Sequence, residues 1–466
     1  MKRKYLALVL LFLSGGTLYA QTPQALADFL NKKNLAHASV SFKAIDLNTK
    51  KIVASHDENR SLTPASNMKL VTTATALEVL GSRFCFETAL LYDGAIQNGT
   101  LNGNIYIKGG GDPTLGSEFT STDKERFLKE WLTAVNRAGI RKIAGNIIAL
   151  DQLFGYEGIY PKWLWEDVGN YYAPGIYGIS AFDDMYRVYL QSSAVDSLTT
   201  VLYTEPEINN LQLTNDIKAS DDTADNSYVF CLPFTYNAHL YGTIPAHRSS
   251  FAAKGSIPDP GLFLATYFRK YLQKNGITTE GNATTFRLYP VTPTGGQLLS
   301  LVHSVDLASI IKITNVESNN QYAEHLYKVL TALDSVDIPD FWKKKGLDAD
   351  ALFMYDGCGL SPQDKVSAAF LIDLLVYMDK QSRNSNAFYQ SLPVAGKNGT
   401  VASFLRNTAL EGKAHLKSGS ISNVQSYSGY IVSKGNRYAV SLIINNFTGK
   451  RSEMKKEIER LFIGLF

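Results

Sequence analysis

The feature that most constrains the fold of this chain is a helical stretch almost without charge. Between Leu70 and Leu80 the residues are apolar or small, and Glu78 is the single charged side chain. Gly81 follows as a fitting C-terminal stop. A helix with so little polar surface must be buried on most of its sides. With 466 residues, 45% of them hydrophobic, the chain has enough material for two or three domains with full cores.

Strand patterns at the two ends of the chain predict a sheet that this helix covers. In residues 39–44 apolar and polar side chains alternate, which is typical of a half-buried strand. The other strand candidates lie at residues 51–55, 413–419, 425–433 and 437–446, and a helix over residues 450–465 closes the chain. We therefore predict an α+β fold in which both ends build one antiparallel sheet flanked by helices.

The composition changes between these ends. From residue 86 to about residue 285, short strand-like segments alternate with Gly/Asn turns, and residues 195–255 are rich in Thr, Ser, Asp and Tyr. We expect β-rich inserted domains here. The expected boundaries are 21–85 with 286–466 for a split main domain, 86–190 with 256–285 for a second domain, and 191–255 for a third domain nested in it.

Residues 1–20 are typical of a secretory signal, with a basic start at residues 2–4 and an apolar core at residues 6–13. The apolar run is too short for an ordinary membrane span, so we expect an exported chain without a strong membrane anchor; an uncleaved anchor is the alternative. Cleavage would leave 43 basic and 43 acidic residues. This balance argues against nucleic acid or an anionic membrane as a partner. The three cysteines are far apart and show no metal-ligand spacing.

Ser66 and Lys69 stand at the start of the charge-poor helix. Thr63 is expected as its N-cap and Pro64 as its first residue, which places Ser66 in the first turn, where N–H groups have no intrahelical partner. Lys69 lies one turn later on the same face, and burial would lower its pKa. A nucleophile, a base and half an oxyanion hole would then coincide. The same Ser-x-x-Lys spacing also occurs at 121/124, 309/312 and 452/455, so the pattern alone has little weight.

Two further motifs follow along the chain. Ser318-x-Asn320 stands at the start of a helical stretch over residues 321–333, where a helix N-cap is the alternative role of the serine. Lys417-Ser418-Gly419 is the only Lys-Ser/Thr-Gly sequence and lies on a predicted strand. The glycine would let a substrate backbone approach that strand closely, and an exposed edge-strand lysine is the alternative.

The ordered trio of motifs resembles the penicillin-recognising serine acyl transferases. The long gap of about 250 residues between the first two motifs is similar to class C low-molecular-mass penicillin-binding proteins, the D-alanyl-D-alanine carboxypeptidase/endopeptidase family. Residues 109–115, 356–361, 392–396 and 399–400 also look like this family. Three residues depart from its usual pattern: Ser418 replaces Thr, Cys358 replaces Ser, and Pro362 replaces Arg.

The resemblance implies a transpeptidase/β-lactamase-like catalytic domain with its insertion between the first two motifs. It implies action on peptidoglycan stem peptides in the periplasm or cell envelope, β-lactams as covalent inhibitors, and no metal or organic cofactor. Whether the protein forms a homodimer is left open.

The resemblance also implies roles for particular residues. Ser66 attacks the carbonyl between two D-alanines, and Lys69 takes its proton. Ser318 passes a proton to the leaving amine with Lys417 tuning it, while Asn320 orients the substrate amide and Lys69. The residues implied in binding the substrate backbone, oxyanion or terminal carboxylate are Ser418, Gly419 and Ser420. Asp151 resembles a family position that reads the amine of the stem-peptide diamino acid, and an ordinary turn aspartate is its alternative.

Two other functions remain as alternatives, a serine β-lactamase and a non-catalytic cell-wall or penicillin-binding protein. Glu166 and Asn170 have the Glu-x-x-x-Asn spacing by which class A β-lactamases deacylate, but here the pair precedes Ser318 instead of following it. We interpret residues 163–167 as interdomain packing, and a wall of a peptide groove is the second role open to them and to Tyr171 and Tyr172.

Overall fold

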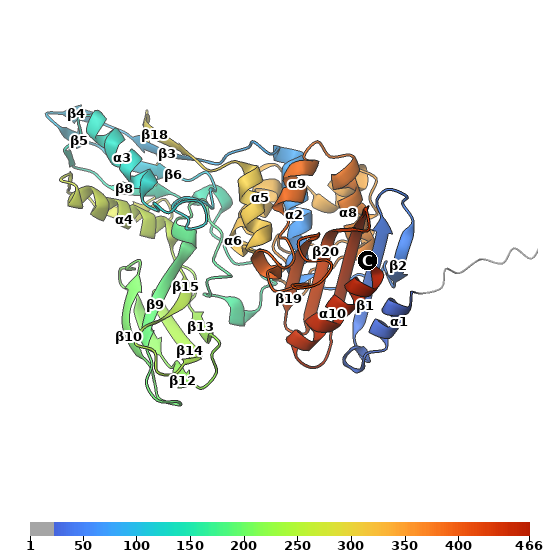
Figure 1. The fold of residues 1–466 in the computed structure, drawn as a ribbon. Coiled ribbons are helices and arrows are strands. Elements are labelled where there is room, and N and C mark those ends of the chain that lie inside the picture. The colour runs from blue at the N-terminus through green and yellow to red at the C-terminus, as the bar shows by residue number, and fades with distance from the viewer. Residues whose placement is uncertain (1–22) are drawn as a thin grey trace, which may run out of the picture.

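A computed structural model describes residues 23–466, so the expected signal at 1–20 lies outside the described residues. The sheet built from both chain ends is present, with strand order β19-β20-β21-β1-β2 and antiparallel neighbours throughout (Figure 1). Its strands are β1 Ser39–Asp46, β2 Ile52–His56, β19 Ala414–Ile421, β20 Val424–Ser433 and β21 Asn436–Asn445. All 8 residues of β1 pair with β21, which joins the two ends of the chain as predicted.

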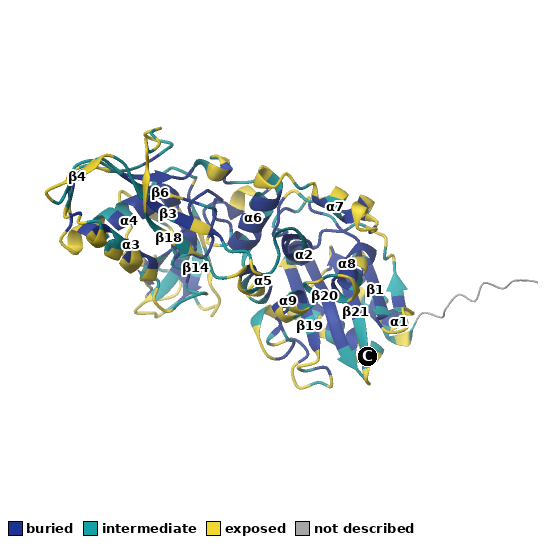
Figure 2. Ribbon diagram, turned by 90° about the horizontal axis from the view of Figure 1, so that it is seen from above, coloured by how far each residue is buried: buried dark blue, intermediate teal, exposed yellow. Residues whose placement is uncertain are grey.

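Helices cover both faces of this sheet. One face carries α2 (Met68–Leu80) and α8 (Ala368–Lys380) in one apolar core, and the other carries α1 (Gln24–Leu30) and α10 (Arg451–Leu465) in a second core. The charge-poor helix α2 is buried from Met68 to Leu77 (Figure 2), and Gly81 ends it with a φ of 82°. The predicted α+β fold is confirmed. The remaining helices near the sheet are α5 Leu307–Val316, α6 Asn320–Lys328, α7 Ile338–Lys344 and α9 Ser385–Ser391.

The inserted region begins with a mixed sheet and two helices, which lie away from the sheet of the chain ends in Figure 1. Its five-stranded part has the order β17-β8-β6-β3-β18, and a smaller sheet has the order β16-β7-β5-β4. These elements are β3 Glu87–Tyr92, β4 Ala95–Gln97, β5 Thr100–Asn102, β6 Ile105–Lys108, α3 Arg126–Arg137, β7 Lys142–Ile143, β8 Ile147–Leu150, α4 Pro260–Lys274, β16 Thr278–Thr279, β17 Ala283–Thr285 and β18 Gln297–His303.

Residues 297–303 correct one expected boundary. They form β18, which pairs antiparallel with β3 of the inserted sheet. The chain therefore reaches the helices of the main domain only at Leu307, the first residue of α5, and not at residue 286. Pairing with a distant strand overrides the local pattern here, because the strand's own sequence does not reveal its partner.

The nested β-rich segment begins at residue 185 with β9, before the expected boundary at residue 191, and forms two small sheets around one apolar core. One has the order β10-β9-β15, and in the other β14 pairs with β11, β12 and β13. The strands are β9 Met185–Gln191, β10 Thr200–Glu205, β11 Gln212–Asn215, β12 Lys218–Ser220, β13 Asn226–Phe230, β14 Asn237–Pro245 and β15 Phe251–Ser256. Within residues 23–466, no helix has the length and apolar character needed to cross a membrane.

Candidate active site

Ser66 lies in a tight turn that precedes α2. Ala65–Asn67 form one turn of 3-10 helix, and α2 begins at Met68. The prediction that Thr63 caps this helix is wrong, since its hydroxyl donates to the Pro362 carbonyl and its N–H to Asn445 Oδ1. The physical reason is the backbone of Ala65, whose φ of 48° breaks the helical path just before Ser66. Among the described residues, no hydrogen bond uses the Ser66 N–H, as expected for an oxyanion donor.

Two glycines enclose this turn from opposite elements. A Cβ on Gly359 would lie 1.9 Å from the Ala65 carbonyl oxygen, and a Cβ on Gly419 would lie 2.4 Å from the Pro64 carbonyl oxygen. Because Gly419 has no side chain, the Ser66 turn can approach β19 closely. Ser426 Oγ on β20 also donates to the Pro64 carbonyl at 2.5 Å. The nucleophile is held against the edge of the sheet by backbone packing.

The substitution Gly419→Ala is expected to slow acylation of Ser66 by a β-lactam about 100-fold, because the Ser66 turn must move to make room for the methyl group. Stopped-flow acylation measures this rate. Gly435→Ala, in the turn between β20 and β21, is the control: its φ of 79° strains the backbone locally, but nothing lies within 4 Å of the added methyl group, so the variant should keep the wild-type rate. Equal rates for the two variants would show that the packing at Gly419 does not position Ser66.

Lys69 is fully buried and makes three hydrogen bonds through its ammonium group. Nζ lies 3.0 Å from Ser66 Oγ, 2.6 Å from Asn320 Oδ1 and 2.7 Å from the Cys358 carbonyl oxygen. Burial lowers the pKa of Lys69, while Cys358 and the nearby carboxyl groups of Asp356, Glu324 and Asp364 oppose that shift. A buried amine with a lowered pKa, in contact with a hydroxyl, is suited to take the proton of that hydroxyl.

Ser318 lies between α5 and α6 in a left-handed conformation, with a φ of 57°. Ser318 is not the N-cap of α6, which was its alternative role. The N-cap is its neighbour Asn319, whose Oδ1 accepts from the Tyr322 N–H at 3.0 Å. Asn320 uses both ends of its amide: Oδ1 accepts from Lys69, and Nδ2 donates to the Tyr172 carbonyl at 2.8 Å. The inserted region thus reaches the site at Tyr172.

Lys417 is fully buried although it lies on the edge strand β19, so the alternative of an exposed edge lysine is wrong. Its Nζ donates to Ser318 Oγ at 2.8 Å and to the Ser418 carbonyl at 2.7 Å. Burial holds the pKa of Lys417 well below its ordinary value, and the charge of Lys69 lowers it further. A second hydroxyl–amine pair therefore stands beside the first.

The remaining predicted residues of β19 are Ser418 and Gly419, which are buried, and Ser420, which is exposed. Ser418 Oγ donates to Thr400 Oγ1 at 2.7 Å. A row of hydroxyl groups next to Lys417 is the kind of surface that a carboxylate can approach.

Asp151 is not joined to this cluster by any hydrogen bond or ion pair of the described residues. It directly follows β8, is 2% exposed, and accepts from the Tyr156 hydroxyl at 2.9 Å. Gly261 of α4 packs against it, since a Cβ there would lie 2.6 Å from Asp151 Oδ2. Burial raises the pKa of this carboxyl to about 6. Its surroundings are those of a packed turn aspartate, the alternative considered for it.

Three buried side chains near Lys69 could hold a metal ion by proximity alone: Glu324, Asp356 and Cys358. The two carboxylates are already used as hydrogen-bond acceptors. Asp356 accepts from the Cys358, Gly359 and Ser361 N–H groups and from the Trp163 indole, and both oxygens of Glu324 accept from the Gly357 N–H. This donor set fits a backbone clamp better than a cation site.

Glu166 and Asn170, the pair with the Glu-x-x-x-Asn spacing, have a structural role in the insertion. Asn170 Nδ2 donates to the Glu166 carbonyl at 2.9 Å, and Asn170 Oδ1 accepts from the Val229 N–H at 3.0 Å. Trp163 packs against Ala323 and Cys358, which confirms interdomain packing for this residue. Trp165 is instead 67% exposed.

Sequence reasoning missed three partners of the site: the Cys358 carbonyl, the Tyr172 carbonyl and the Thr400 hydroxyl. A carbonyl is present in every residue, so the sequence offers no signal for the first two. Thr400 stands in a stretch that looked like the family, which is the one signal that could have pointed to it.

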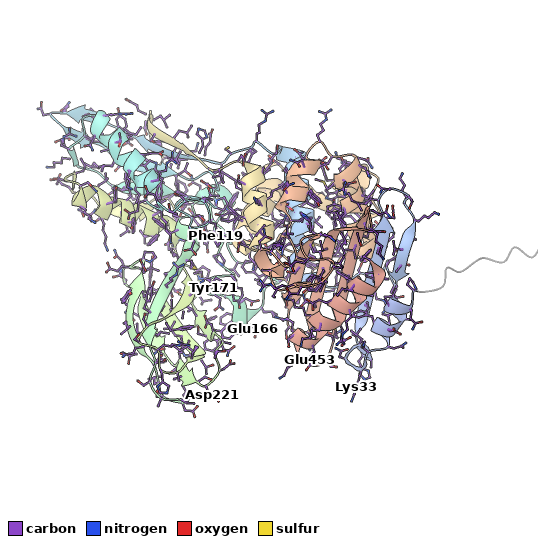
Figure 3. The ribbon with its side chains drawn as sticks, in the orientation of Figure 1. Lys33, Phe119, Glu166, Tyr171, Asp221 and Glu453 are labelled. Carbon is purple, nitrogen blue, oxygen red and sulfur yellow. The ribbon has the colours of Figure 1, made fainter. Side chains whose placement is uncertain are left out.

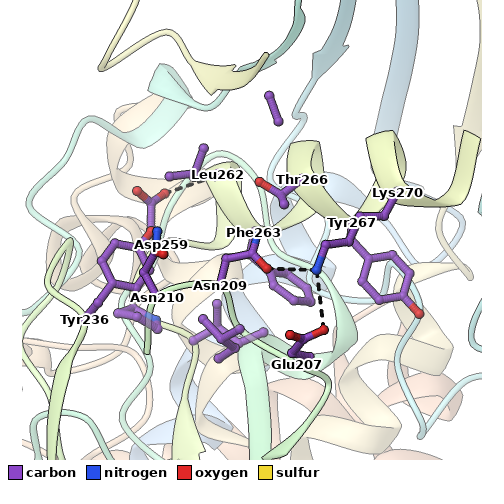
Figure 4. A pocket seen from close by; sticks show the side chains of 14 residues that line it. Glu207, Asn209, Asn210, Tyr236, Asp259, Leu262, Phe263, Thr266, Tyr267 and Lys270 are labelled. Atoms are coloured by element: carbon purple, nitrogen blue, oxygen red, sulfur yellow. Dashed lines mark hydrogen bonds and ion pairs between the residues drawn. The ribbon is translucent and has the colours of Figure 1, made fainter. Parts of the chain in front are cut away.

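Two cavities differ in their relation to this cluster. One of about 200 Å³ is lined by residues 318–320 and by the insertion, where Phe119 and Tyr171 face the catalytic part (Figure 3). The other, of about 300 Å³, lies beside α4, where Lys270 Nζ donates to Asn209 Oδ1 (Figure 4). No predicted site residue lines the second cavity. Of these two cavities, only the first adjoins predicted site residues.

A serine next to a buried amine, backed by a second serine–lysine pair on an antiparallel sheet, defines a serine acyl transferase of the penicillin-recognising class. The model of the D-Ala-D-Ala carboxypeptidase 3 (S13) family matches residues 22–462. Since this match covers nearly the whole chain, the protein belongs to that family of serine peptidases. The family match confirms the expected family, fold class and D-Ala-D-Ala carboxypeptidase activity.

Individual relatives agree with the family. The D-alanyl-D-alanine carboxypeptidase of Actinomadura sp. (strain R39) is 28% identical over 428 residues, which cover 87% of this chain and 77% of the relative. DacB of Haemophilus influenzae is 23% identical over 444 residues, which cover 91% and 89%. The crystal structure of penicillin binding protein 4 (dacB) from Haemophilus influenzae has the same fold, with a TM-score of 0.79 at 22% identity over 94% of this chain and 98% of that one.

Proposed function

We propose that this protein hydrolyses the D-alanyl-D-alanine bond of peptidoglycan stem peptides through an acyl-enzyme on Ser66. The observation that carries the proposal is the contact of 3.0 Å between Ser66 Oγ and the fully buried Nζ of Lys69. Ser66 itself is half-buried, so a substrate can reach its hydroxyl while the base stays dry. The exported location expected from residues 1–20 would place the enzyme at its substrate.

In acylation, the neutral amine of Lys69 takes the proton of Ser66 Oγ, and the oxygen adds to the carbonyl carbon between the two D-alanines. The N–H groups of Ser66 and Ser420 receive the oxyanion. The C–N bond then breaks; Ser318 passes its proton to the departing D-alanine amine and takes a proton from the Lys417 ammonium, whose Nζ donates to Ser318 Oγ at 2.8 Å. Water adds to the ester carbon, and the proton it loses restores the Lys417 ammonium through Ser318. The ester bond breaks, the shortened peptide leaves, and Lys69 returns the first proton to Ser66 Oγ.

The substrate would lie between β19 and the cavity beside residues 318–320. Ser418, whose hydroxyl contacts that of Thr400, would bind the terminal carboxylate, and Asn320 would bind the peptide amide. An amide NH₂ has two donors, so Asn320 can keep the Tyr172 carbonyl and still bind substrate. Tyr171 and Tyr172 wall the cavity, which supports the groove role considered for them.

A β-lactam would acylate Ser66 in the same way and stall as the ester, because its ring carbonyl presents the same target. The penicillin binding protein 4 from Haemophilus influenzae has been crystallised with a β-lactam, which supports this proposal. The structural role of Asn170 argues against a β-lactamase, because its side chain links two parts of the insertion by accepting from the Val229 N–H of β13. A pure binding protein would not require two buried lysines, each in contact with a serine.

The test compares two substrates of the purified mature chain. We expect D-alanine release from a D-alanyl-D-alanine peptide to exceed hydrolysis of a penicillin. Faster penicillin hydrolysis would instead identify a β-lactamase. No release, together with no covalent labelling by penicillin, would identify a binding protein.

A further inference from the structure

One short segment of the insertion contacts two groups that hold Lys69. We call residues 163–172 the brace. At one end of it, Trp163 Nε1 donates to Asp356 Oδ2 at 2.8 Å. At the other end, the Tyr172 carbonyl accepts from Asn320 Nδ2 at 2.8 Å. Both contacts cross from the insertion to the catalytic domain.

Each end of the brace leads directly to an acceptor of the lysine. Asn320 binds Lys69 through the other atom of the same amide, so the contact with Tyr172 fixes which atom faces the amine. Asp356 accepts from the Cys358 N–H at 3.0 Å, and the Cys358 carbonyl accepts from Lys69 at 2.7 Å. Two of the three acceptors of Lys69 therefore depend on the insertion.

The brace is itself well fixed. Trp163 is 8% exposed and packs against Ala323 of α6 and Cys358. The Tyr172 hydroxyl donates to Asp167 Oδ1 at 3.0 Å within the brace. Asn170 accepts from the Val229 N–H of β13, which ties the brace to the nested β-rich sheets. A movement of those sheets would be transmitted to Lys69 through the brace and through the two acceptors that the brace supports, Asn320 and the Cys358 carbonyl.

We propose that the brace is a positioning element for Lys69, and that the insertion thereby sets the acylating power of the catalytic domain. The proposal rests on the proposed function of Lys69 as base. Its physical basis is that displacement of a catalytic group by about 1 Å costs about 100-fold in rate.

Loosening the brace has a predictable electrostatic effect. Burial is the main cause of the lowered pKa of Lys69, so water admitted beside Cys358 would raise that pKa toward its ordinary value. The neutral amine would then require a higher pH. The charged or titratable groups facing Lys69 are Glu324 on α6, Asp356, Cys358 and Asp364 on the loop before α8, and Lys417 on β19.

The substitution Trp163→Phe keeps an aromatic ring and removes the indole donor. We expect acylation by penicillin to slow about 10- to 100-fold, and the acidic limb of its pH profile to move to higher pH. The ¹³Cε NMR titration of Lys69, assigned with Lys69→Met, should move in the same direction. Trp165→Phe is the matched control: this ring also lies in the brace, but it is 67% exposed, it packs on Phe230 of β13, and its indole N–H makes no hydrogen bond to the described residues of the catalytic domain.

A second variant, Asn170→Ala, loosens the brace at its tie to Val229 and should shift the titration in the same direction by a smaller amount. An unchanged Lys69 titration in both variants would overturn the proposal, even if thermal stability fell. The NMR readout needs no turnover. An inactive wild type would therefore contradict the proposed function, while the titration would still decide on the brace.

Discussion

Replacement of Ser66 by alanine is expected to abolish both D-alanine release and covalent labelling by penicillin. The reason is chemical: the variant lacks the oxygen that forms the ester, and no other hydroxyl lies within hydrogen-bond reach of Lys69 Nζ among the described residues. The helix should stay intact, because Ser66 contributes no cap to α2. Labelled penicillin followed by denaturing gel electrophoresis measures the result.

The chain offers its own control for this variant. Ser309 and Lys312 have the same Ser-x-x-Lys spacing on α5, but both side chains are exposed. Ser309→Ala should therefore be labelled like the wild type. Labelling of Ser66→Ala at the wild-type level would remove Ser66 as the nucleophile.

Replacement of Lys69 by methionine is expected to slow acylation by about 10² to 10⁴, the contribution of a general base. Methionine fills much of the space of the lysine stem, so the core around α2 should remain folded. Burial lowers the pKa of Lys69, so the wild-type rate should rise with pH through a value below that of a free lysine. The variant should lose this limb of the profile.

Stopped-flow acylation between pH 5 and pH 10 measures both effects. Lys312→Met is the matched control, since that lysine is exposed on α5 and should leave rate and profile unchanged. If Lys69→Met acylated at the wild-type rate, another group would have to take the proton of Ser66.

Much of the catalytic domain could be predicted from local pattern. The charge-poor run at 70–80 required burial, and α2 is buried. The alternating residues at 39–44 predicted a strand, which is β1, but helices cover both faces of the sheet and none of the 8 residues of β1 is exposed. The order of three short motifs identified five side chains that the structure brings together. Two of their contacts are Lys69 with Asn320 and Lys417 with Ser318.

The predictions that failed concern contacts that the local sequence pattern does not reveal. Thr63 looked like an N-cap, but the left-handed Ala65 and the pairing of Thr63 with Asn445 prevent it. The expected boundary at residue 286 missed β18, whose partner β3 lies on the far side of the insertion in sequence. For Asp151, the sequence could not show that Gly261 of α4 packs against its carboxylate, and its role toward a substrate stays a prediction. The pairing of β18 and the packing at Asp151 involve neighbours far away in the chain, whereas Thr63 is affected both by the distant Asn445 and by the backbone of Ala65, two residues away.

The central claim, an acyl-enzyme on Ser66, is tested most directly by mapping the adduct. Wild-type protein would be incubated with penicillin, digested and sequenced by tandem mass spectrometry. The account predicts a mass increase equal to that of the intact β-lactam, carried by the peptide that contains Ser66 and localised to its hydroxyl. An adduct on any other residue, or a wild type that releases D-alanine without ever forming an adduct, would contradict it.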